Sequence, residues 1–219
     1  MSNQLKIKKG INFLSPFYDF FAFIFFGNAI WRSQKHFVPE LSASKSVLIL
    51  GGGTGKILEE LMKHKTGENY FYVDVSDKMI LKTKKRIQKH FPEKLNTVAF
   101  ICGSVNDLPY QTNFDLIVTP FVLDFFSDAE LAEAMNALNK KLSPDGKWLF
   151  TDFNIPQKGF MRLLSKIYIS ILYFFFRIVC GLRVERLPDF EKYFSELNFK
   201  MEKEKYFFGV MMVGRVYAR

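Results

Sequence analysis

Short apolar runs alternate with amphipathic segments through the middle of the chain. The first run, 47–50, leads into a glycine-rich turn, and a helical pattern of apolar positions follows over 54–65. The alternation continues with strands predicted at 70–75, 97–102, 115–119 and 147–153, and helices predicted at 76–89 and 131–142. Strands that alternate with helices favour a parallel sheet with helices on both faces. The pattern therefore predicts a doubly wound α/β fold.

The two ends of the chain follow other patterns. Residues 11–37 are apolar and aromatic, and predict one or two helices broken near Pro16 and Gly27, after a basic N-terminus that we expect to be frayed. Beyond the fifth strand we expect a long helix over 160–180, a shorter one over 189–197, and a hairpin of 201–208 and 210–217. No internal repeat or low-complexity linker is present, so we predict a single domain: an N-terminal helical cap (1–45), a core (46–153), a helical insertion (154–198) and a C-terminal hairpin (199–219).

The glycine-rich turn is the first candidate for chemistry. It reads Gly-Gly-Gly-Thr-Gly over 51–55, between a buried strand and a helix N-terminus. Such a loop exposes backbone amides beside the positive end of a helix dipole. By itself it also suits a nicotinamide dinucleotide fold or a turn without a ligand. Lys56 is followed by Ile57 rather than Ser or Thr, so the ending of a phosphate-binding loop is absent.

Three further stretches follow predicted strands. Asp74 ends the second strand at 23 positions beyond Gly51, where a carboxylate can accept both hydroxyls of a ribose; capping of the next helix is the alternative. The stretch 103–110 follows the third strand and could border an adenine, or be an ordinary polar loop. The fourth strand ends at Thr119. Because the carboxyl ends of parallel strands share one crevice, we expect these stretches to meet there.

Together with the turn at 142–147, these stretches resemble the class I S-adenosylmethionine-dependent methyltransferases over about 47–153. Tyr18-Asp19, the loop at 52–55 and the turn Leu108-Pro109-Tyr110 are most similar to the group that includes the ubiquinone and menaquinone C-methyltransferases. The resemblance implies a Rossmann-like seven-stranded sheet, mostly parallel, to which the C-terminal hairpin adds antiparallel strands. It also implies that the N-terminal cap and the insertion after strand five cover the acceptor site.

The resemblance also implies S-adenosyl-L-methionine as the cofactor and assigns residues to its parts. Gly51, Gly53 and Thr54, with Gly52 in the same loop, would face the methionine portion, and Asp74 would hold the ribose. The remaining assignments are to the adenine and to the path of the methyl group: Val75 and Met79 beside the adenine, Ser104 and Val105 at its edge, Thr119 and Pro120 along the path.

The chain departs from the pattern of that group at three positions. Ile49 stands where members usually carry an acid that helps to hold the methionine amino group, and Ser104 stands where many have Asp. Asp124 replaces the Arg that follows strand four in the quinone enzymes. We therefore do not carry over the quinone substrate or its catalytic Arg.

Methyl transfer from a sulfonium is an in-line displacement that chiefly requires alignment of the nucleophile and exclusion of water. A base is required only when the acceptor is protonated. Tyr18, His36 and Asp124 are the candidates, each with a structural alternative. We favour Asp124 and Tyr18 as catalytic residues, because both are expected near the crevice and a lone His is more often structural.

Composition points to the kind of acceptor. Phe contributes 26 residues, and the aromatic excess is concentrated in 13–31 and 160–176, the segments expected to cover the acceptor site. We therefore expect a small apolar or amphiphilic acceptor. Arg162, Lys166, Tyr173 and Arg177 share one face of the helix at 160–180, which suits either an interfacial helix in peripheral contact with a membrane or a core helix with a solvated face. The uncharged runs at 20–31 and 167–176 are shorter than a membrane span, and none is predicted.

The net charge of +9 leaves other functions open. An RNA methyltransferase is one alternative, favoured by Lys82, Lys84, Lys85, Arg86 and Lys89, but the Asn-Pro-Pro-Tyr type of motif and an RNA-binding module are absent. A non-catalytic cofactor-binding protein is a second alternative, and a nicotinamide dehydrogenase fits least well. Cys102 and Cys180 lack metal-ligand spacing, so we predict no metal site and no disulfide. We expect a cytoplasmic protein, in peripheral contact with the inner face of the membrane if the interfacial reading holds.

Overall fold

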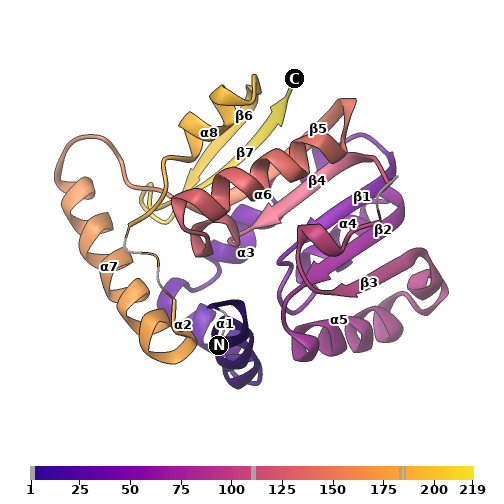
Figure 1. The fold of residues 1–219 in the computed structure, drawn as a ribbon, viewed down its shortest axis with the longest axis horizontal. Helices are drawn as coiled ribbons and strands as arrows, with labels where there is room; N and C mark the ends of the chain where they lie inside the picture. The colour runs from indigo at the N-terminus through magenta and orange to yellow at the C-terminus, as the bar shows by residue number, and fades with distance from the viewer. Residues whose placement is uncertain (1–2, 110–111, 183, 185) are drawn as a thin grey trace.

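The computed structural model describes residues 3–109, 112–182, 184 and 186–219, and contains a seven-stranded mixed sheet. The strands are β1 (Ser44–Leu50), β2 (Gly67–Asp74), β3 (Val98–Cys102), β4 (Phe114–Pro120), β5 (Leu142–Phe153), β6 (Lys200–Phe207) and β7 (Met212–Ala218). Their order is β3-β2-β1-β4-β5-β7-β6 (Figure 1). The first five pair in parallel, while β7 is antiparallel to both β5 and β6. The predicted doubly wound sheet with a C-terminal antiparallel hairpin is confirmed.

Helices cover both faces of the sheet: α3 (Ala29–Lys35), α4 (Lys56–Lys63), α5 (Asp77–His90), α6 (Asp128–Lys141) and α8 (Phe190–Glu196). Alternate residues of β1 enter different apolar clusters, as the pleat of a strand requires. Leu48 and Leu50 pack in the cluster with residues of α6 and α8, whereas Val47 and Ile49 pack in the cluster with residues of α4 and α5. Burial of β1 on both faces explains its unbroken apolar run.

The turn expected at 142–147 lies inside a strand. β5 begins at Leu142, which pairs with Phe114, and the next paired residues are Lys147 and Leu116. The extra residues of β5 between these pairs form an irregularity in the ladder, so a Ser-Pro-Asp-Gly sequence is accommodated without ending the strand.

The described part of the N-terminal cap, from residue 3, contains three α-helices rather than one or two. These are α1 (Asn3–Leu14), α2 (Tyr18–Phe26) and α3, which are separated near Pro16 and Gly27 as predicted. The expectation of a frayed N-terminus was wrong from Asn3 onward, because α1 packs against α7 (Phe160–Cys180). A Cβ at Gly10 would lie 2.2 Å from Cα of Cys180, so the two helices are in backbone contact there.

Helix α7 lies at the margin of the molecule beside α1 and α2 (Figure 1). It covers the predicted residues and buries one face: Ser165, Ile169, Leu172, Tyr173 and Cys180. Of the helices described, it alone is long and apolar enough to cross a membrane by length and composition. The sequence analysis predicted no membrane span here because it counted only the uncharged residues 167–176. The helix is longer because Arg162, Lys166 and Arg177 are compatible with helical structure.

Candidate functional site

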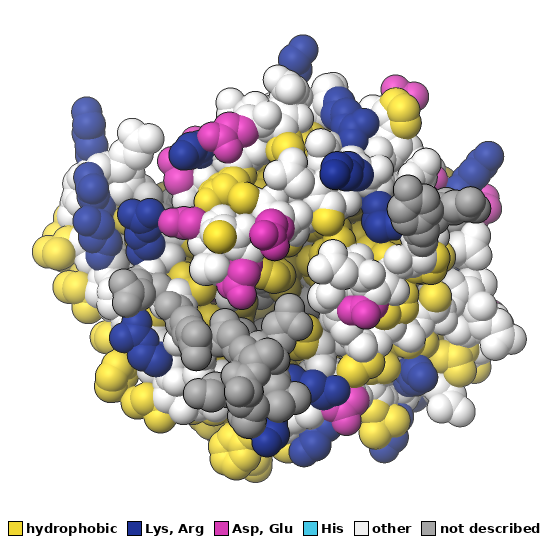
Figure 2. Space-filling view, viewed as in Figure 1, with side chains coloured by type: hydrophobic (Ala, Val, Ile, Leu, Met, Phe, Trp, Pro, Cys, Tyr) yellow, Lys and Arg dark blue, Asp and Glu magenta, His cyan; other side chains and the backbone are white. Residues whose placement is uncertain are grey.

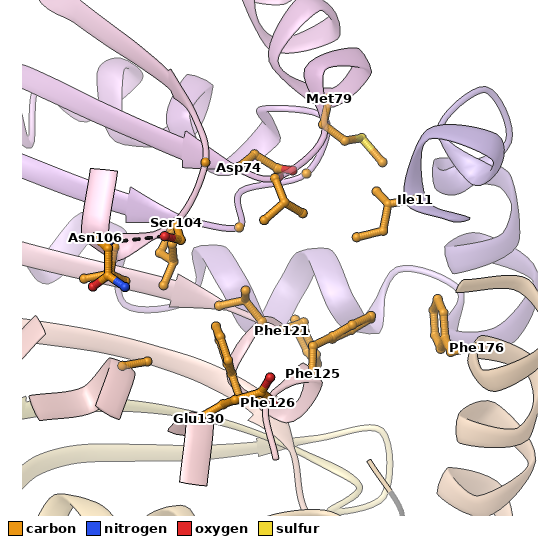
Figure 3. Close-up of a pocket in the computed structure, with 18 of the residues that line it drawn as sticks. Ile11, Asp74, Met79, Ser104, Asn106, Phe121, Phe125, Phe126, Glu130 and Phe176 are labelled. Atoms are coloured by element: carbon orange, nitrogen blue, oxygen red, sulfur yellow. Dashed lines mark hydrogen bonds between the residues drawn. The ribbon is translucent and has the colours of Figure 1, made fainter. Parts of the chain in front are cut away.

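A cavity of about 240 Å³ opens at the carboxyl ends of β1, β2 and β3 and beyond the end of β4 (Figure 3). Its wall is built from the loops that follow these strands, from α1 and from α6. Among the residues that line it are Leu14, Gly51, Gly53, Asp74, Val75, Met79, Ser104, Val105, Asn106, Phe121, Val122, Phe125, Glu130, Glu133 and Phe176. The cavity lies at the edge where a doubly wound sheet binds its ligands.

The glycine loop forms one wall of this cavity in a left-handed backbone conformation. Gly51 has φ +70° and Gly53 has φ +61°. A Cβ at Gly51 would lie 2.4 Å from Cγ2 of Val122, so only glycine fits between this loop and the segment after β4. The loop is held from behind by side chains, because the Gly53 carbonyl accepts hydrogen bonds from Tyr72 at 2.9 Å and Thr83 at 3.2 Å.

The N-terminal cap is fastened to the same loop. The Thr54 hydroxyl is within hydrogen-bonding distance of both Asp19 carboxylate oxygens, at 3.1 and 3.2 Å, and Lys56 Nζ lies 3.2 Å from Asp19 Oδ1. Arg86 Nε donates to the Thr54 carbonyl at 2.8 Å. Asp19 and Arg86 therefore position the loop, a role that sequence patterns could not assign because both partners are distant in the chain.

Asp74 ends β2 and faces the cavity (Figure 3). Its Oδ1 accepts the amide hydrogen of Ser76 at 2.9 Å. The side chain is almost fully buried, and burial raises the pKa of the carboxyl group to about 6 despite that hydrogen bond. A carboxylate fixed at a strand end in this way can accept hydrogen bonds from two neighbouring hydroxyls.

The loop after β3 supplies the opposite wall. Ser104 caps the short 3₁₀ helix Val105–Asp107: its hydroxyl donates to Asp107 at 3.0 Å and accepts from the Asn106 amide at 3.3 Å. The Ser104 side chain is thus used within its own turn. Val105 is buried at the cavity wall, and Met79 projects into the cavity from α5 (Figure 3). Together with Val75, they form an apolar slot suited to a planar base.

The structure brings seven of the predicted cofactor residues to the cavity wall: Gly51, Gly53, Asp74, Val75, Met79, Ser104 and Val105. Four others lie outside it: Gly52, Thr54, Thr119 and Pro120. A Cβ at Gly52 would lie 2.6 Å from the Tyr72 ring, so this glycine serves packing. Thr119 is fully buried and accepts a hydrogen bond from Trp148 Nε1 at 2.9 Å, while Pro120 is buried in the ladder opposite Thr151. These positions correct the expectation that both residues line a path for the methyl group.

The two predicted catalytic residues are placed differently. The side chain of Tyr18 lies outside the part of the chain that the structure describes. Asp124 belongs to the 3₁₀ helix Leu123–Phe125 and is fully buried, and it lines neither this cavity nor the neighbouring one described below. Burial raises the pKa of Asp124 to about 7, and its nearest titratable neighbours are Asp152 and Tyr173. Asp124 therefore does not reach the cavity in this conformation.

A second, smaller cavity adjoins the first. Leu14, Phe121, Phe125 and Phe176 line both, so the two are neighbours. Every residue that lines the second cavity is apolar: Leu14, Phe21, Ala22, Phe25, Phe26, Ile30, Phe121, Phe125, Phe153, Leu172, Phe175 and Phe176. The sequence identified the two aromatic segments concerned. It could not show that α2 and α7 converge on the residues after β4, because that convergence requires the chain to fold back over the sheet.

Other cavity residues escaped the sequence analysis. Glu130 and Glu133 reach the cavity from α6, and Glu130 also caps that helix by accepting from the Ser127 amide at 2.9 Å. The capping-box sequence is visible in the chain but points to a helix start rather than a ligand. No group of three or more potential metal-ligating side chains is found within the described residues.

Ile49 stands where related methyltransferases usually carry an acid, and the register of β1 decides where its side chain lies. Ile49 is fully buried and packs among residues of α4 and α5 on the face opposite the first cluster. A carboxylate at this position would have to leave an apolar environment to meet a ligand. The acids that do line the described cavity are Asp74, Glu130 and Glu133.

The central part of the chain is similar to known methyltransferases. Residues 47–146 match the family described as a methyltransferase domain. The ubiquinone/menaquinone biosynthesis C-methyltransferase UbiE of Shewanella baltica is 29% identical over 145 residues, which are 64% of this chain and 56% of that protein. The chain therefore spans little more than half the length of the curated relatives it matches.

Solved structures agree on the fold. The N-methyltransferase NodS from Bradyrhizobium japonicum WM9, in complex with S-adenosyl-L-homocysteine, gives a TM-score of 0.62 at 16% identity over 86% of each chain. An O-methyltransferase family protein from Burkholderia thailandensis gives 0.67 at 17% identity over 84% of this chain and 55% of its own. At such identities the likeness concerns the fold alone.

The cavity fits the cofactor of this family on its own chemistry. Glycines without side chains line one wall, a buried carboxylate stands at the end of β2, and Val75, Met79 and Val105 form an apolar slot. These would face the methionine portion, the ribose and the adenine of S-adenosylmethionine, respectively. Residues 47–146 therefore match a methyltransferase domain, and the cavity at their strand ends has a lining suited to S-adenosylmethionine.

Proposed function

We propose that this protein transfers a methyl group from S-adenosylmethionine to a small apolar or amphiphilic acceptor. The observation that carries the proposal is the second cavity, which is lined by apolar side chains throughout and shares four of them with the cofactor cavity. A polar acceptor would lose its hydration there without new hydrogen bonds, whereas an apolar one gains from burial.

The residues of this chain would act mainly by placement. The bound cofactor supplies an activated methyl group on a sulfonium. Phe121 and Phe125 stand between the two cavities and would orient the acceptor, while Phe176 of α7 helps to cover both cavities. In-line transfer at this junction requires that water be excluded, and the aromatic lining favours that. Catalytic roles for Tyr18 and Asp124 remain proposals, and that of Asp124 needs a movement that uncovers it.

The proposed function is tested in two steps. Calorimetry with S-adenosylhomocysteine first measures cofactor binding, and transfer of a labelled methyl group to a panel of hydrophobic phenols and amines then measures activity. Ala22→Trp should fill the second cavity, lowering transfer at least tenfold while leaving the affinity for S-adenosylhomocysteine unchanged. Ala129→Trp, at an exposed position on α6, is the matched control.

The outcomes separate the alternatives. Transfer to RNA but not to the hydrophobic panel would favour an RNA methyltransferase, and binding without any transfer would favour a non-catalytic cofactor-binding protein. The basic run on α5 gives limited support to RNA, because Lys82 donates to the Ser15 carbonyl and Arg86 pairs with Glu59 at 2.8 Å. A lack of S-adenosylhomocysteine binding would contradict the whole proposal.

A further inference from the structure

The outward face of α7 is apolar and exposed to solvent. Its side chains lie along one stripe, on the side opposite the buried face: Phe160, Leu163, Leu164, Ile167, Ile171, Phe174 and Ile178, which are between 36% and 73% exposed. The helix is thus apolar on both its inner and outer faces. A helix that only covered a soluble core would present polar residues outward.

Helix α2 extends this surface. The rings of Phe21 and Phe25 pack against Phe175 of α7 with centroids 5.9 and 6.0 Å apart, and Tyr168 donates a hydrogen bond to the Phe25 carbonyl. The two helices are therefore side by side. Helix α2 and the residues just before it add further exposed apolar side chains: Phe13, Phe17, Phe20, Phe23 and Ile24.

The positive charge of the protein is concentrated in the wider segments that contain these helices, although α2 itself carries no Lys or Arg. Residues 1–39 contain five Lys or Arg and one acid, and residues 154–184 contain five Lys or Arg and no acid. The rest of the chain contains 21 basic and 21 acidic residues, so these segments account for the whole net charge of +9. Lys166 and Arg177 are exposed along one flank of the apolar stripe. Figure 2 shows hydrophobic side chains along the margin formed by α7, with Lys and Arg beside them.

An apolar stripe flanked by cations matches an anionic bilayer surface. We propose that α2 and α7 form a docking face that lies in the interface of a membrane containing anionic lipids. A second copy of the chain is a poorer occupant, because it would oppose two surfaces of the same charge. The inner face of α7 packs on the domain through Ile169 and Leu172, and this favours a helix lying along the membrane over one that crosses it. The proposal stands independently of methyl transfer.

The test is co-sedimentation of the full chain with vesicles of phosphatidylcholine alone or mixed with phosphatidylglycerol. We expect binding to the anionic vesicles that is at least tenfold stronger and that weakens as salt is raised. Ile167→Ser with Phe174→Ser should remove the binding, and Lys166→Glu with Arg177→Glu should lower it at least tenfold. Leu81→Ser and the pair Lys85→Glu with Lys89→Glu change equally exposed residues on α5 and should bind as the unchanged protein does.

Each contrary result overturns the proposal. Equal binding to both kinds of vesicle, or apolar variants that bind normally, would remove the docking face. A dimer in solution that the α7 variants dissociate would assign the face to a second copy. Protein that resists extraction from vesicles by salt and alkali would indicate a crossing helix. Calorimetry with S-adenosylhomocysteine on the same variants should be unchanged, and this separates loss of docking from loss of folding or cofactor binding.

Discussion

The carboxyl groups of Asp124 and Asp152 are buried together, and the charge of Asp124 helps to raise the pKa of Asp152. Desolvation is the larger cause of that shift, and both side chains are almost completely inaccessible to solvent. Asp124 Oδ1 and Asp152 Oδ2 lack hydrogen-bond partners among the residues the structure describes. Tyr173 of α7 lies beside them, and burial followed by the charge of Asp124 raises the pKa of its phenol. The pair therefore favours a protonated, neutral state under α7.

This pair should make the protein less stable as pH rises from about 4 to about 7. The pKa of Asp124 is raised to about 7, so the folded state binds more protons than the unfolded state in that window. The side chain of Asp124→Asn is neutral at every pH. The free energy of unfolding of this variant, relative to that of the unchanged protein, should therefore rise by up to about 4 kcal/mol between about pH 4 and about pH 7. Urea unfolding at several pH values measures the difference. Parallel stability curves for Asp124→Asn and the unchanged protein would contradict the prediction.

Asp74 should control cofactor affinity. Asp74→Ala removes the carboxylate proposed to hold the ribose, and we expect affinity for S-adenosylhomocysteine to fall by about tenfold to a hundredfold, from the loss of charge-assisted hydrogen bonds. Because burial raises the pKa of Asp74 to about 6, binding by the unchanged protein should also weaken as pH falls below 6. Calorimetry from pH 5 to pH 8 measures both effects. An affinity unaffected by Asp74→Ala would withdraw the ribose assignment.

Gly51 should be irreplaceable for two separable reasons. Gly51→Ala places a Cβ at φ +70° and 2.4 Å from Val122, whereas Gly27→Ala imposes φ +55° with no neighbouring atom within 4 Å. The Gly27 variant should lose about 1–3 kcal/mol of stability, because its backbone at φ +55° and ψ −130° lies in a region that L residues rarely adopt. The Gly51 variant should lose more and should also weaken cofactor binding. Thermal unfolding and calorimetry of both variants provide the comparison; equal losses would show that contact with Val122 is unimportant.

Thr119 should contribute to the stability of the folded protein rather than to cofactor binding. Thr119→Val leaves the buried Trp148 Nε1 without its acceptor, at a cost of about 1–3 kcal/mol. Its affinity for S-adenosylhomocysteine should not change, because Thr119 lies outside the cavity wall. Chemical denaturation and calorimetry decide the point. A large loss of affinity in a stable variant would restore the sequence-based assignment.

The sequence was sufficient where chemistry and conformation are local. The apolar run of β1 predicts a strand buried on both faces, and the glycines after it predict a left-handed turn, because both depend on neighbouring residues alone. The distance from Gly51 to Asp74 follows from the length of one helix and one strand. These features placed most of the predicted cofactor residues in one cavity.

Tertiary structure decided everything that depends on distant partners. The orientation of Thr119 toward Trp148, the bracing of Thr54 by Asp19 and the burial of Asp124 against Asp152 arise from segments far apart in the chain. The exposed stripe of α7 belongs with them. Composition identifies an apolar helix with two apolar faces. Which of them stays in solvent is decided only when α1, α2 and the end of β5 pack against the other face. A sequence fixes the spacing of side chains along an element, whereas burial and partnership depend on how the elements pack.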